Sequence, residues 1–123
     1  MNKDPLTDQV IGLAMEVHRQ LGSGLLESAY EQCLCHELAN ANMGFERQKY
    51  IGIDYKGTRL NCGFRADLIV ENKLLIELKA IERILPIHEA QLLTYVKLSE
   101  IGTGLILNFN TKVLKDGIKR MVL

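Results

Sequence analysis

Apolar side chains fall on nearly every even-numbered position between residues 64 and 80 of the chain. Successive side chains of a β-strand point to opposite faces, so this alternation predicts a strand that ends at about Val70 and another from about Leu74 to Ala80. The opposite face is at least partly covered, because Ile69 and Leu75 share it with charged residues. The predicted apolar face consists of Phe64, Ala66, Leu68, Val70, Leu74, Ile76 and Leu78.

The polar turn between these two strands determines their register. A three-residue loop at 71–73 keeps both apolar sets on one face, and it sets Asp67 opposite Glu77 and Arg65 opposite Lys79. Directly opposed side chains lie roughly 5 Å apart at Cβ. Two carboxylates at that separation repel each other, which favours a bound cation or a raised pKa. Because buried charges must be paired or bound to a metal, we expect this face to carry chemistry.

The rest of the chain predicts two helices before these strands and one after them. Thr7 or Asp8 is expected to cap the first helix, which Gly22 ends, and Ser23 to cap a second helix over residues 25–42. The buried stripe predicted for that second helix is Leu26, Tyr30, Cys33, Glu37 and Ala41, with Glu27 at its edge. The remaining predicted elements are strands at 46–55 and 59–70, a helix at 86–99 and strands at 105–109 and 118–122.

Composition indicates an ordinary globular protein, expected to form one domain over residues 1–123. Of the 123 residues, 47% are hydrophobic and 24% are charged, which is enough to build a core. No apolar run approaches the ~20 residues of a membrane span, so we expect no membrane partner. Three cysteines, an odd number, favour reduced thiols and a cytoplasmic location. Residues 47–123 carry a charge balance of +5, compatible with an anionic partner, whereas residues 1–46 carry −5.

Asp67 followed by Glu77-Leu78-Lys79 resembles the D…(D/E)-x-K pattern of the PD-(D/E)xK nuclease superfamily. More narrowly, residues 24–30 match the GxxExxY signature and resemble the family named for it. The resemblance spans residues 6–122, although Ala66 stands where the superfamily usually has a proline that the chemistry does not require. Further segments similar to that family are Tyr55-Lys56-Gly57, Arg65-Ala66-Asp67, Gln91-Leu92-Leu93-Thr94-Tyr95 and Gly104-Leu105-Ile106-Leu107-Asn108-Phe109.

The resemblance implies an α/β fold with a restriction-endonuclease-like αβββαβ core, an extra N-terminal helix, a C-terminal strand and a mixed sheet flanked by helices. It implies a RecB-like nuclease that cuts nucleic acid, DNA being the expected substrate, with Mg²⁺ or Mn²⁺. Phosphodiester hydrolysis needs a hard cation, an activated water and charge relief, which these residue types supply. The implied catalytic residues are Asp67, Glu77, Lys79, Glu27 and Gln91, the implied metal ligands are Asp67, Glu77, Glu27 and the Leu78 carbonyl, and the implied substrate-binding residues are Arg65, Tyr95 and Tyr30.

Several of these roles have structural alternatives. Tyr30 lies in an apolar stripe, so packing is at least as good an explanation as catalysis, and Arg65 can bind phosphate or simply neutralise the carboxylates. Glu27 can be a solvated helix residue, and Gln91 and Tyr95 can be a satisfied core pair. The rival function is a catalytically weak or inactive nuclease-fold module that binds nucleic acid or protein. A homodimer or a partner protein can complete the substrate channel.

Overall fold

The computed structural model of the chain describes residues 4–123, which form three α-helices, one five-stranded sheet and a short 3₁₀ helix. This confirms the predicted α/β order of elements. Most predicted boundaries lie within a few residues of the observed ones, and the helix over 86–99 and the last strand agree at both ends. The elements are α1 (Pro5–Leu21), α2 (Glu27–Asn40), β1 (Phe45–Tyr55), β2 (Thr58–Val70), β3 (Leu74–Lys79), α3 (Pro86–Ser99), β4 (Thr103–Asn108), η1 (Leu114–Gly117) and β5 (Ile118–Val122).

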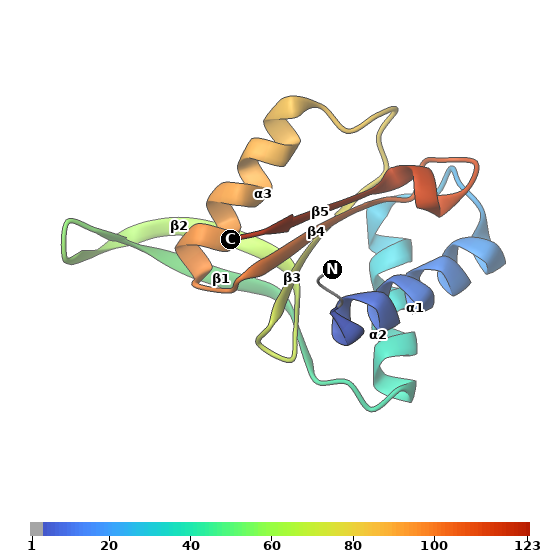
Figure 1. Cartoon of the computed structure of the whole chain (residues 1–123), viewed down its shortest axis with the longest axis horizontal. Coiled ribbons are helices and arrows are strands. Elements are labelled where there is room, and N and C mark those ends of the chain that lie inside the picture. The colour runs from blue at the N-terminus through green and yellow to red at the C-terminus, as the bar shows by residue number, and fades with distance from the viewer. Residues whose placement is uncertain (1–3) are drawn as a thin grey trace.

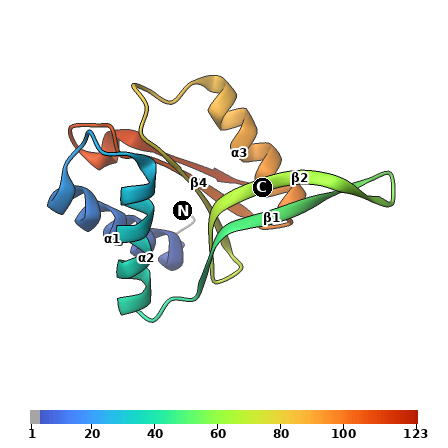
Figure 2. The same cartoon turned by 180° about the vertical axis from the view of Figure 1, so that it is seen from behind.

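The sheet is mixed and has the strand order β1-β2-β3-β4-β5. Only the central β3–β4 pair is parallel, because α3 returns the chain to the edge where β3 began. Figures 1 and 2 show α1 and α2 on one side of the sheet and α3 on the other, while the tip of the β1–β2 hairpin projects away from the body. The parallel pairing places the carboxyl ends of β3 and β4 side by side, with Lys79 opposite Asn108.

Two hydrophobic cores fill the space on either side of the sheet. The larger one lies under α1 and α2, where the Tyr30 ring stacks on Phe109 with centroids 4.4 Å apart. The smaller one lies under α3 and includes Leu92 and Val96. β4 is buried from Gly104 to Asn108, which is typical of an apolar strand covered on both faces. Within residues 4–123, no helix has the length and hydrophobicity needed to cross a bilayer.

The predicted register of β2 and β3 is confirmed where the two strands pair, but the common apolar face is not continuous. Leu68 pairs with Ile76, and Val70 with Leu74, as the three-residue loop requires. However, Phe64 and Ala66 pack in the α3 core, whereas Leu68 faces the other core, so the prediction of one face was wrong for these two residues. The change of face accompanies a break in the β1–β2 ladder, which has no Cα pair at Gln48 and Asp67.

The helix starts differ from those predicted because other residues supply the caps. Asp4, not Thr7 or Asp8, caps α1: its carboxylate accepts the Leu6 N–H at 3.2 Å, and Pro5 occupies the first turn. Ser23 caps nothing, since α2 begins after Leu26 without a side-chain cap. The buried face of α2 is also not the predicted stripe but Tyr30, Glu31, Leu34, Cys35 and Leu38.

Replacing Gly104 by alanine should destabilise the fold. The added Cβ would clash with Val96 Cγ2 and lie 2.9 Å from Leu92 Cδ1, so α3 would have to move away from β4. Overpacking of this kind lowers the free energy of unfolding by about 1–3 kcal/mol. Gly102→Ala is the matched control, because its Cβ meets nothing within 4 Å. Urea unfolding should separate the two variants, and equal stabilities would contradict this packing of α3.

Candidate functional site

The predicted carboxylates meet where β2 and β3 separate. Paired Cα positions end at Leu68–Ile76, and the next residues on each strand, Asp67 and Glu77, bond across the gap through their side chains. The Asp67 backbone N–H donates to Glu77 Oε2 at 3.0 Å, and the Leu78 N–H donates to Asp67 Oδ2 at 2.8 Å. The ladder does not continue to the predicted pairing of Arg65 with Lys79. Each carboxylate therefore satisfies a main-chain donor of the opposite strand and is held in a defined direction.

Burial disfavours the ionised forms of both carboxyl groups, and a neighbouring carboxylate adds to this effect for each of them. Glu77 is 7% exposed, and its pKa is raised to about 7, first by burial and then by the negative charge of Asp67. The pKa of Asp67 is also raised, mainly by burial, although hydrogen bonds from the Leu78 backbone and the Gln48 side chain oppose this. Two acids that resist ionisation side by side form a place where a positive charge would be stabilised.

Lys79 and Glu27 lie at the rim of this pair. Lys79, at the end of β3, is near enough for its charge to oppose the raised pKa of Asp67, Glu77 and Glu27. It forms none of the ion pairs found within residues 4–123. Glu27, at the first turn of α2, is exposed, and its pKa is raised chiefly by partial desolvation. The structure thus brings Asp67, Glu77, Lys79 and Glu27 to one end of the sheet.

Of the two residues of α3 predicted to face the site, Gln91 and Tyr95, only Tyr95 lies near the carboxylates. Tyr95 stacks on Phe64 with ring centroids 3.9 Å apart. Its pKa is raised by burial and then by Glu77 and Asp67, which places the phenol near the carboxylates. Gln91, one helical turn earlier, is exposed at the surface of α3 rather than satisfied in the core.

Tyr30 and Arg65 form contacts within the protein that account for their positions without a bound substrate. Tyr30 is 0% exposed; its hydroxyl donates to the Gly22 carbonyl at 2.7 Å and accepts the Leu25 N–H at 3.1 Å. These bonds and its stacking favour the packing alternative, because a buried ring offers no surface to a substrate. Arg65 is exposed, and its Nη1 donates to the Gln48 carbonyl at 3.1 Å instead of pairing with a carboxylate.

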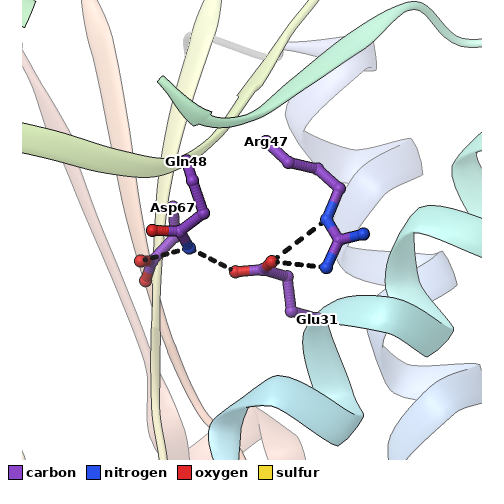
Figure 3. Close-up of polar contacts among 4 residues, drawn as sticks. All are labelled: Glu31, Arg47, Gln48 and Asp67. Carbon is purple, nitrogen blue, oxygen red and sulfur yellow. Dashed lines mark hydrogen bonds and ion pairs between the residues drawn. The ribbon is translucent and has the colours of Figure 1, made fainter. Parts of the chain in front are cut away.

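A polar network that the sequence analysis did not anticipate adjoins Asp67 (Figure 3). Gln48 Nε2 lies 2.8 Å from Glu31 Oε1 and 3.3 Å from Asp67 Oδ1. Arg47 donates to Glu31 Oε2 through both Nε and Nη2, at 3.1 and 2.9 Å. One signal could have revealed it: Glu31 lies on the same helical face as Leu34 and would need a partner there.

The donor set suits a hard divalent cation, although only two acidic side chains meet closely. In residues 4–123, no group of three or more His, Cys, Asp or Glu side chains is arranged to hold a metal ion. Mg²⁺ is usually bound by one or two carboxylates and retains several waters, so Asp67 and Glu77 satisfy its usual requirement. The Leu78 carbonyl and Glu27 remain predicted ligands.

One comparison with known proteins identifies the family of the chain. Residues 4–121 match the family model described as PD-(D/E)XK nuclease superfamily. A solved structure, "Crystal structure of SSO0001", aligns with a TM-score of 0.43 and 19% identity, covering 98% of this chain and 78% of that one. No match to a curated protein was found. The mixed sheet flanked by helices is consistent with a restriction-endonuclease-like fold, and the family match spans nearly every residue of the chain: the protein belongs to the PD-(D/E)XK nuclease superfamily.

Proposed function

We propose that the protein hydrolyses phosphodiester bonds of nucleic acid, DNA being the expected substrate, with Mg²⁺ or Mn²⁺. Membership of the superfamily suggests nuclease activity, and members typically use divalent metals. One observation carries the assignment to particular residues: Asp67 and Glu77 converge where β2 and β3 part, with Lys79 beside them. The GLLESAY segment further supports placement in the GxxExxY family and the RecB-like branch, as a single domain.

The two carboxylates would hold the ion, and their present bonds leave them free to do so. Each oxygen of a carboxylate has two lone pairs, and the bonds described above occupy one on Glu77 Oε2 and one on each oxygen of Asp67. A bound divalent ion would polarise the scissile phosphate and lower the pKa of a water molecule. A cation bound between the two acids would also reduce the electrostatic penalty of keeping both ionised.

The remaining residues are assigned by charge and position. The Lys79 charge acts on both carboxylates, and its ammonium group would orient the attacking water or stabilise the negative charge that develops on the phosphate. Glu27 would bind a water or the ion at the rim, and Gln91 and Tyr95 would contact the substrate from α3. Arg65, exposed on β2, would reach a backbone phosphate.

Glu77→Gln and Lys79→Met should each lower the rate of DNA cleavage by about 100-fold or more, as removal of a general acid–base or charge-stabilising group does. Glu77→Gln should retain its fold, because burial already disfavours the ionised acid. Gel assays on labelled single- and double-stranded DNA with Mg²⁺ or Mn²⁺ measure the loss. Glu100→Gln and Lys119→Met, both at exposed positions, are the charge-matched controls. Cleavage that persists in both site variants would place the activity elsewhere.

Mn²⁺ should raise the melting temperature of the wild-type protein but not that of Asp67→Asn combined with Glu77→Gln. An ion that binds only the folded state stabilises it by about 2.7 kcal/mol at 100 times its Kd. Differential scanning fluorimetry measures the shift without requiring a substrate. The same experiment separates the nuclease from the rival binding module, since the latter needs no ion between these acids. Equal shifts in the two proteins would remove the metal site from Asp67 and Glu77.

A further inference from the structure

Gln48 forms a bridge between two carboxylates that come from different elements. Its Nε2 approaches Glu31 of α2 at 2.8 Å and Asp67 of β2 at 3.3 Å, as Figure 3 shows. Both neighbours are acceptors when ionised, so only the NH₂ end of the amide can lie between them, and each N–H serves one carboxylate. The bridge therefore defines the orientation of Gln48 and ties Asp67 to α2.

The backbone at Gln48 adopts a conformation that side chains of this kind seldom take. Its φ is +48°, in the left-handed region, and it lies at the break in the ladder between Arg47–Leu68 and Lys49–Ala66. The Arg65 guanidinium donates to its carbonyl at 3.1 Å. A non-glycine residue persists in this region only where its surroundings stabilise it, and here both the carbonyl and the side chain are bonded.

The far end of the bridge is anchored by an ion pair. Glu31 is 7% exposed, and Arg47 holds its Oε2 through two nitrogens while Gln48 takes its Oε1. The Arg47 charge balances the buried carboxylate, and with Arg47 on Oε2 and Gln48 on Oε1 both oxygens of Glu31 are restrained. Glu31 is therefore held in place, and through its hydrogen bond to Gln48 it restrains the amide that contacts Asp67.

We infer that Gln48 is a positioning residue for the metal site, anchored by Glu31 and Arg47, and that it sets how tightly Asp67 and Glu77 take up a divalent ion. The inference rests on the proposed function for the identity of the site. Asp67 Oδ2 accepts from the Leu78 backbone and Oδ1 from Gln48, so both oxygens are restrained and these bonds oppose rotation of the carboxylate. Each oxygen keeps one lone pair, and their shared orientation determines where an ion can sit.

Gln48→Met and Gln48→Asn test this inference by calorimetric titration of the folded proteins with Mn²⁺. Methionine keeps the length without a donor, whereas asparagine tolerates a positive φ but is one methylene too short to bridge. Both should bind Mn²⁺ about 10-fold more weakly, within the range seen when outer-shell partners of metal ligands are lost. Gln20→Met is the matched control, because Gln20 also donates to a glutamate, Glu16, at 2.8 Å on exposed α1 surface.

Gln48→Asn separates positioning from stability. It should unfold at about the same urea concentration as the wild type, because the preference of asparagine for the left-handed region offsets the lost hydrogen bond to Glu31, and yet lose Mn²⁺ affinity. A merely structural role would leave the affinity of every folded variant unchanged, and that result would overturn the inference. So would a loss of affinity in Gln20→Met as large as that in the Gln48 variants.

A double-mutant cycle tests the anchor. Glu31→Met should weaken Mn²⁺ binding in the wild-type background but by less than about twofold in the Gln48→Met background, because Glu31 acts through Gln48. Independent effects that multiply would overturn this coupling. Wild-type protein that binds no Mn²⁺ would overturn the inference together with the metal site. Wild-type protein that binds Mn²⁺, shows the Gln48 effect and cleaves no nucleic acid would overturn only the proposed function.

Discussion

The reciprocal bonding of Asp67 and Glu77 with the opposite strands is the constraint on which the site depends. A ladder that continued past Leu68–Ile76 would pair main chain with main chain and leave the two carboxylates without a backbone donor on the opposite strand. Instead, each carboxylate takes the place of a carbonyl acceptor and stays between the strands. β3 tolerates this opening because its other edge remains paired with β4 as far as Lys79–Asn108. The parallel pair at the centre of the sheet thus supports the gap beside it.

Placing Asp67 and Glu77 side by side in a largely buried position lowers the stability of the fold but creates a site that can bind a cation. Burial and the neighbouring Asp67 raise the pKa of Glu77 to about 7, so ionising both acids in the free protein costs free energy. The backbone N–H groups of Asp67 and Leu78 offset part of that cost. The positive charge of Lys79 offsets a further, smaller part. Apolar residues at positions 67 and 77 would be more favourable for stability alone. The flanking residues of the two strands are apolar, at positions 66, 68, 76 and 78.

Local pattern was sufficient to predict the register at the site but not the path of β2. The alternation through residues 68–78, together with a three-residue loop, correctly paired Leu68 with Ile76 and so brought Asp67 beside Glu77. Phe64 and Ala66 reached the other core because the hairpin changes course at Gln48, whose positive φ has no signature in a glutamine. Glu31 and Gln48 were missed for a related reason: they meet across 17 residues of sequence, and no period relates them.

The position of α2 links the core to the site. Glu27 and Glu31 lie one turn apart on this helix, so its rotation decides whether both face the sheet. Tyr30, between them, is stacked on Phe109 of the segment after β4, and its hydroxyl holds the turn before the helix at Gly22 and Leu25. The tyrosine is therefore too deeply buried to meet a substrate, yet it fixes the orientation of the two glutamates. This structural role explains the tyrosine of the GLLESAY segment. The buried ring fixes the rotation of α2, and that rotation determines which way Glu27 and Glu31 point.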